Sequence, residues 1–196
     1  AAGTVGQATG SPGVCLATLG PGACNLVLGV GDALLDRHPV LALSARTATS
    51  LAGWHSHQNL ELNAMFAPIT KASVSLHGTG TRETLRRAID IALTPPRGPV
   101  YLSLPGDVAT QPDEDRAGAS LSIEPSPPTD QHTLEKIQTA LNRAKRPAAV
   151  VGIALDQRKD APGVRSFLAH TGIPYADTPK TKGLADPTAD AFLGTC

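Results

Sequence analysis

A Gly-Pro-Gly sequence at positions 20–22 separates two apolar stretches with different periodicities. Residues 14–17 before it are long enough for one buried strand, and apolar residues from 26 to 35 recur at helical spacing. The turn therefore joins a strand to a helix. Two interpretations fit it: a turn whose glycines let the backbone approach a ligand, with the proline in the first helical turn, or a tight connection without a ligand.

The rest of the chain is predicted to alternate strands and helices. Continuous apolar runs indicate strands of a parallel sheet that is covered on both faces, and amphipathic stretches indicate helices. The predicted strands are residues 14–17, 40–44, 71–76, 99–104, 147–152 and 173–176. The predicted helices are residues 1–10, 21–38, 60–66, 81–93, 132–144 and 162–171. The fold class is therefore α/β, with parallel-sheet units of three layers.

The helix predicted at residues 81–93 has one apolar and one charged face. The residues expected to face the core are Leu85, Ala88, Ile89 and Ala92. Thr81 is expected to be the N-cap, because threonine is common at that position.

The composition changes in the middle of the chain. Residues 107–130 are rich in Pro, Asp, Ser and Gly, and this stretch is longer than most loops within a domain. The expected organisation is a domain at 1–112, a linker at 113–130 and a second domain at 131–196. There is no initiator Met, and no closing element is expected around Gly194, so both ends are expected to be cut.

Charge and cysteine content argue against several classes of function. The chain has 17 Lys and Arg residues and 17 Asp and Glu residues, so electrostatics gives no reason to expect nucleic acid or an anionic membrane as a partner. No apolar run is long enough to span a bilayer. The three cysteines have no metal-ligand spacing, and their odd number argues against a disulfide framework, which predicts a reducing, cytoplasmic compartment.

Several segments occur in the order that one enzyme family shows. They are residues 7–14 (QATGSPGV), 18–26 (TLGPGACNL), 32–40, 57–58 (HQ), 68–71 (PITK) and 97–108, followed by 146–152, 172–174 and 182–183. Together they resemble the thiamine-diphosphate-dependent enzymes of the acetolactate synthase group. The resemblance covers nearly the whole chain but only part of that family's three α/β domains.

The resemblance implies a place for this chain in such an enzyme. Residues 1–112 match the later part of the pyrimidine-binding domain, and residues 131–196 match the start of the central, Rossmann-like domain. The resemblance implies a carboligase or decarboxylase, that is, a transferase or lyase, which acts on a 2-oxo acid or related carbonyl substrate with thiamine diphosphate and Mg²⁺. It also implies a homo-oligomer, either a dimer or a tetramer. The family's catalytic glutamate and Mg²⁺ site match no part of this chain, so the chain alone is expected to be inactive. FAD binding by the central domain is left open.

The Gly-Pro-Gly turn carries the residues that the resemblance assigns to the cofactor. Pro21 and Asn25 match family positions that line the pyrimidine pocket, and Gly20 and Gly22 flank Pro21 in the same motif. A plainer interpretation of Asn25 is a helix cap, because Asn is common at that position.

Residues 57–59 carry the positions that the resemblance assigns to the substrate. Gln58 matches a family glutamine that reaches the reaction centre. His57 stands where acetolactate synthases have Phe, and Asn59 stands where they have Glu. A polar ring beside the substrate favours a carbonyl or carboxylate substrate other than that of acetolactate synthesis. A solvated loop histidine is the plainer interpretation of His57.

Two other functions fit parts of the sequence. A non-catalytic homologue, acting as an interaction or regulatory module, would keep the fold and lack the catalytic glutamate. A nicotinamide-binding Rossmann protein would explain residues 151–154, but the second and third glycines of its fingerprint are missing. Lys71, in the PITK segment, has a plainer interpretation as a solvated charge at a strand end.

Overall fold

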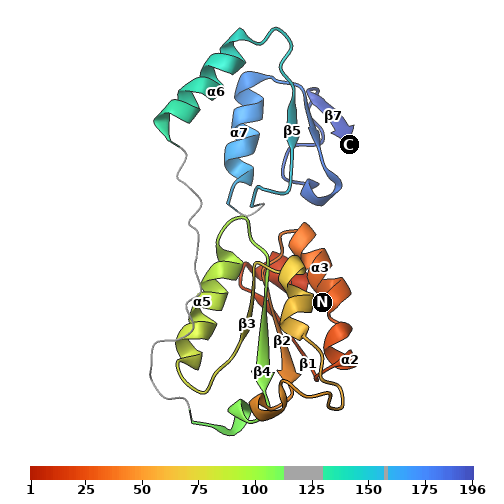
Figure 1. Ribbon diagram of the computed structural model, residues 1–196. Helices are drawn as coiled ribbons and strands as arrows, with labels where there is room; N and C mark the ends of the chain where they lie inside the picture. The colour runs from red at the N-terminus through yellow and green to blue at the C-terminus, as the bar shows by residue number, and fades with distance from the viewer. Residues whose placement is uncertain (113–129, 157–158) are drawn as a thin grey trace. The chain divides into compact units, whose positions relative to one another are not determined.

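The computed structural model describes residues 1–112, 130–156 and 159–196 (Figure 1). The chain divides into two compact units, Ala1–Ser126 (unit 1) and Pro127–Cys196 (unit 2). The linker expected at 113–130 lies outside the described residues except for its last position. The assignment of the two units to a pyrimidine-binding domain and a central domain stays a prediction.

Unit 1 contains a parallel sheet. Its strands are β1 (Gly13–Ala17), β2 (Val40–Arg46), β3 (Ala72–Ser75) and β4 (Pro99–Pro105), in the order β1-β2-β4-β3. The central strands β2 and β4 pair in register from Val40 with Pro99 to Arg46 with Pro105. Each neighbouring pair in this sheet is parallel, which confirms the predicted α/β fold class.

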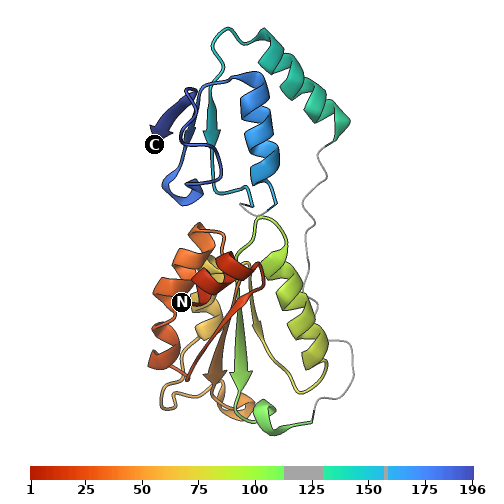
Figure 2. The same ribbon diagram turned by 180° about the vertical axis from the view of Figure 1, so that it is seen from behind.

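Helices cover both faces of this sheet. They are α1 (Ala2–Thr9), α2 (Pro21–Cys24), α3 (Val27–Leu35), α4 (Leu62–Phe66) and α5 (Thr81–Leu93), with the 3-10 turns η1 (Thr49–Leu51), η2 (Ala67–Ile69) and η3 (Val108–Thr110). Side chains alternate between the two faces along a strand. In β4, Tyr101 packs with residues of α3 and α4, whereas Val100 and Leu102 pack with residues of α5. Figures 1 and 2 show α5 on one side of the sheet and α3 on the other, which gives three layers.

Helix α5 has the predicted bounds, but two predictions about it are wrong. Ile91 is 5% exposed, whereas Ile89, expected in the core, is 37% exposed. The N-cap is Gly80, with φ 68°, and not Thr81. Thr81 is the first helical residue, and its hydroxyl donates to the carbonyl of His77 at 2.8 Å.

Unit 2 contains a second parallel sheet, with strand order β5-β6-β7. Its elements are α6 (Gln131–Arg143), β5 (Ala149–Val151), α7 (Ala161–Thr171), β6 (Tyr175–Asp177), η4 (Pro179–Thr181) and β7 (Phe192–Thr195). The sequence predicted no closing element, and β7 corrects this. Its two apolar residues are followed by Gly194, whose φ is 113°, so the strand carries too short a pattern to be recognised.

Lys71 is not a solvated charge. Its ammonium group donates to the carbonyls of Ile91 and Thr94 at the C-terminal end of α5, the latter at 2.6 Å. The carbonyl of Ile91 has no helical donor four residues on, because residue 95 is a proline. A positive charge also suits the negative end of the helix dipole. Burial lowers the pKa of Lys71.

Lys71→Met is therefore expected to lower the free energy of unfolding by about 1–2 kcal/mol, because the variant keeps the aliphatic chain and loses both hydrogen bonds. Urea denaturation of the wild type and the variant measures this difference. Lys136→Met is the matched control, since it removes an exposed lysine from α6. Equal destabilisation by the two substitutions would contradict the assigned role of Lys71.

Candidate functional site

The Gly-Pro-Gly turn follows the carboxyl end of β1, as predicted. Gly20 is the N-cap of α2, and Pro21 is its first residue. The helical stretch is not continuous, because α2 ends at Cys24 and α3 begins at Val27. Asn25 occupies the C-cap of α2 and is not the N-cap of the following helix, which is Leu26.

The structure brings Gly20 into direct contact with Gln58. A Cβ built on Gly20 would lie 2.7 Å from both the Cβ and the carbonyl oxygen of Gln58. A Cβ built on Gly22 would lie 2.3 Å from the Cγ2 methyl of Thr18. A Cβ at position 20 would therefore displace the backbone of Gln58, whereas at position 22 it would meet only the end of the exposed Thr18 side chain. The sequence left two interpretations of these glycines open, and the Gly20 contact adds a reason within the protein for the glycine at position 20.

The other predicted site residues are exposed. Four of them lie on the surface of unit 1: Pro21 at the start of α2, Asn25 at its C-cap, and His57 and Gln58 in the loop before α4. Among the described residues, the side chains of Asn25, His57 and Gln58 have no hydrogen-bond partner. Two amides and an imidazole are therefore available to bind a polar ligand. Gly20 and Gln58 are the pair that the fold brings into contact.

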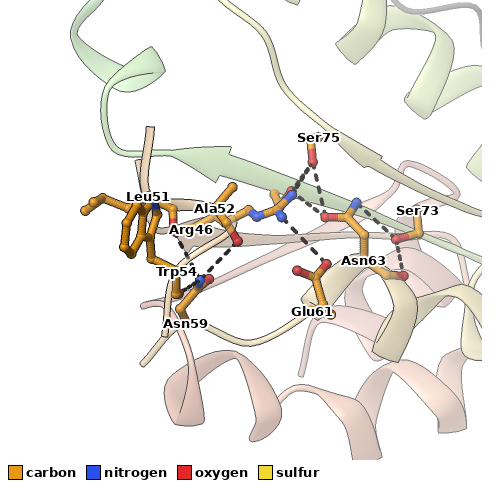
Figure 3. A network of polar contacts seen from close by, with 10 residues as sticks. Arg46, Leu51, Ala52, Trp54, Asn59, Glu61, Asn63, Ser73 and Ser75 are labelled. Atoms are coloured by element: carbon orange, nitrogen blue, oxygen red, sulfur yellow. Dashed lines mark hydrogen bonds and ion pairs between the residues drawn. The ribbon is translucent and has the colours of Figure 1, made fainter. Parts of the chain in front are cut away.

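The loop at residues 47–59 is folded around Asn59. The Nδ2 of Asn59 donates to the carbonyls of Leu51, Ala52 and Trp54, at 3.4, 3.3 and 2.9 Å (Figure 3). A glutamate carboxylate in this place would accept hydrogen bonds only and could not bind three carbonyls. Asn59 thus shapes the loop that carries His57 and Gln58, a role that the sequence analysis did not assign to it.

A polar network fixes α4 to the carboxyl ends of the strands (Figure 3). Arg46, the last residue of β2, donates to the hydroxyl of Ser75 at 3.2 Å and lies 3.6 Å from the carboxylate of Glu61. The Oδ1 of Asn63 accepts from the hydroxyls of Ser75 and Ser103, at 3.2 and 2.8 Å. Because Glu61 and Asn63 follow Gln58 closely, this network fixes the end of the loop. The sequence analysis missed it, although serines in β3 and β4 interrupt otherwise apolar strands.

The start of the loop is held by Asp107. The backbone N–H of Thr49 donates to one carboxylate oxygen of Asp107 at 3.0 Å, and its hydroxyl donates to the other. The side-chain hydrogen bond from Thr49, followed by the backbone one, lowers the pKa of Asp107. Asp107 belongs to the segment 97–108 that the sequence analysis singled out, and the structure gives that segment a contact with this loop.

This contact makes the stability of the loop depend on pH. A carboxyl group whose pKa is lower in the folded state stabilises the fold above its unfolded pKa of about 4, and this contribution is lost as the pH falls through the folded value. Asp107→Asn should therefore lower the melting temperature more at pH 7 than at pH 3. Asp32→Asn, at an exposed carboxylate, is the control. A difference that grows on acidification would contradict the assignment.

Within residues 1–112, 130–156 and 159–196, no three His, Cys, Asp or Glu side chains gather in a way that could hold a metal ion. The helices of these same residues include none with the length and apolar character needed to cross a membrane.

Comparison with known proteins supplies the family. Residues 1–65 match the family model of the N-terminal TPP binding domain of thiamine pyrophosphate enzymes. Residues 1–65 belong to this thiamine pyrophosphate enzyme family. The matched range contains the Gly-Pro-Gly turn, Asn25, His57 and Gln58, and the observed parallel α/β architecture agrees with this domain.

Acetolactate synthases are similar to this chain over most of its length. The chain is 34% identical over 191 residues to acetolactate synthase 2, chloroplastic, of Nicotiana tabacum, and the match covers 94% of this chain and 28% of that protein. It is 30% identical over 196 residues to the large subunit of acetolactate synthase isozyme 2 of Escherichia coli (strain K12), covering 96% and 34%. Acetolactate synthase of Bacillus subtilis (strain 168) is 29% identical over 192 residues, covering 97% and 34%. The chain spans about a third of the length of these relatives.

Proposed function

We propose that this chain is part of a thiamine-diphosphate-dependent carboligase or decarboxylase, a transferase or lyase that acts on a 2-oxo acid or a related carbonyl substrate. The contact between Gly20 and Gln58 carries the proposal, because it joins the turn assigned to the cofactor to the loop assigned to the substrate. Similarity to acetolactate synthases over 94% to 97% of the chain supports the reaction class.

The residues of the turn fit an aminopyrimidine. Such a ring offers hydrogen-bond donors and acceptors, and the exposed amide of Asn25 can both donate and accept. We assign Pro21 and Asn25 to contact with the pyrimidine, and Gly20 and Gly22 to the turn that holds these two residues in place. The cofactor, when bound, supplies the electron sink for cleaving or forming a C–C bond next to a carbonyl.

The residues of the loop fit a polar substrate. Gln58 can donate a hydrogen bond to a carbonyl or carboxylate oxygen, and His57 places a second polar group next to it in the sequence. We assign both to substrate contact in the reaction. The Phe-to-His difference from acetolactate synthases supports a substrate preference different from theirs.

The proposal extends to the rest of the protein. Mg²⁺ would be held by residues outside this chain, and the compartment would be the cytoplasm. Self-association is supported by Leu28 and Leu35, which are 85% and 77% exposed on α3, the helix after the cofactor turn. Partner subunits would cover these side chains in a homo-oligomer.

The test is an assay of the full-length protein that contains this chain. It should release CO₂ from at least one of a panel of 2-oxo acids that includes pyruvate and 2-oxobutyrate, and only when thiamine diphosphate and Mg²⁺ are both added. The isolated chain, as the control, should show no turnover and weak or no binding of thiamine diphosphate by calorimetry. A full-length protein that binds the cofactor and turns over no 2-oxo acid would favour the non-catalytic homologue.

A further inference from the structure

Two residues with positive φ lie against each other in unit 1. Gly20 has φ 57° and ψ −125°, and Gln58 has φ 59°. The Gly20 conformation is open to glycine and strained for any L-residue with a Cβ. Gln58 is one of two non-glycine residues with positive φ among the described residues. Such strain persists only where the surroundings impose it.

The surroundings of Gln58 are fixed on three sides. The next residue, Asn59, donates to three carbonyls of the same loop. Glu61 pairs with Arg46. Gly20 is buried and closes the third side, with its Cα hydrogens against the Cβ and carbonyl of Gln58. The side chain of Gln58 itself stays exposed and has no hydrogen-bond partner among the described residues.

We propose that Gly20 is a positioning residue for Gln58: the absent Cβ at position 20 is what allows the Gln58 backbone to take its place and present its amide. This inference rests on the proposed function, in which Gln58 contacts the substrate. Contacts of a Cβ below 3.0 Å are essentially absent from proteins, so alanine at position 20 must displace Gln58 or the turn. Since a Cβ at position 20 would meet the Cβ, Cα and carbonyl oxygen of Gln58, that displacement moves its side chain.

The first experiment measures this displacement in the chain itself, without any activity. Gly20→Ala should shift the backbone amide resonances of residues 56–60 and speed their hydrogen exchange. Gly53→Ala is the matched control, because a Cβ at Gly53 meets nothing within 4 Å although it lies in the same loop. It should perturb only its sequence neighbours. Unchanged resonances at residues 56–60 in Gly20→Ala would overturn the proposal.

A second variant keeps the test decisive if Gly20→Ala folds poorly. Gly20→Ala/Gln58→Gly removes one of the two closest contacts and the strain of a non-glycine residue at positive φ. It should regain part of the lost melting temperature. Equal melting temperatures of the single and double variants would overturn the proposal, since the Gln58 contact would then not be the source of the loss.

A double-mutant cycle in the full-length protein tests the functional consequence. Gly20→Ala should lower kcat about a hundredfold with little change in KM, as small displacements of reacting groups do. In a Gln58→Ala background, Gly20→Ala should cause no further loss of kcat, because the amide that it displaces is already absent. It should still lower the melting temperature, because alanine at position 58 keeps the Cβ and the carbonyl oxygen that a Cβ at position 20 would meet. Equal kcat losses in both backgrounds would show that Gly20 acts on the cofactor directly. A wild type without turnover would defeat the proposed function, while the resonance and hydrogen-exchange measurements would still decide the contact.

Discussion

Gln58→Ala is expected to lower the kcat of the full-length protein about a hundredfold, which is the usual cost of removing a hydrogen-bond donor that faces developing charge. Binding of thiamine diphosphate should change little, because we assign the cofactor to the turn that begins at Gly20. An interaction made mainly in the transition state affects kcat and kcat/KM together. Steady-state kinetics and cofactor titration of the same preparations measure both effects.

His55→Ala is the matched control for this prediction. His55 is exposed in the same loop, and neither the sequence nor the structure assigns it to the site. Its kcat should remain close to the wild-type value. A Gln58→Ala variant with normal kcat and a weakened cofactor affinity would show that Gln58 belongs to the cofactor site, and the proposed roles of the two segments would have to be exchanged.

Much of the fold could be predicted because it depends on local patterns. The continuous apolar run of β2 and the strand-turn-helix at Gly20 were visible in the sequence. The buried face of α5 was not, because Ile89 and Ile91 both fit an apolar helical stripe. Contacts with the sheet decide which of the two isoleucines is buried, because Ile91 packs in the same cluster as Leu41 and Leu102. Periodicity gives the spacing of a stripe, and tertiary contacts select which one is buried.

The site was predicted only in part, for a related reason. Motifs indicated the turn and the residues His57 and Gln58, each from neighbouring positions in the sequence. The contact between Gly20 and Gln58 joins distant segments, and the sequence carries no period that reports it. Asn59 was visible only as a departure from the family pattern. The role of Asn59 depends on three backbone carbonyls that accept its hydrogen bonds, and these carbonyls come together only when the loop folds.

Tyr101→Ala is expected to cause the largest loss of stability. Tyr101 is fully buried, and its ring stacks on Phe66 with centroids 4.0 Å apart and an interplanar angle of 7°. Its hydroxyl lies 2.6 Å from the hydroxyl of Ser44. Removing a buried aromatic side chain costs about 3–5 kcal/mol through lost contacts and a cavity. Aromatic residues make up only 3% of the sequence, so few side chains of similar size are present to fill this cavity.

Tyr101→Phe separates the ring from the hydroxyl. It keeps the stack on Phe66 and loses one hydrogen bond, so it should cost about 1 kcal/mol, because the Ser44 hydroxyl also donates to the Ala45 carbonyl. Urea denaturation of both variants measures the two costs. Similar losses of stability for both variants would show that the hydroxyl pair, and not the ring stack, supplies the stabilisation.

The same two variants should differ in the loop that precedes α4. Since Phe66 ends α4, loss of its stack with Tyr101 should also loosen this loop. Hydrogen exchange at residues 56–60 should therefore accelerate in Tyr101→Ala but not in Tyr101→Phe.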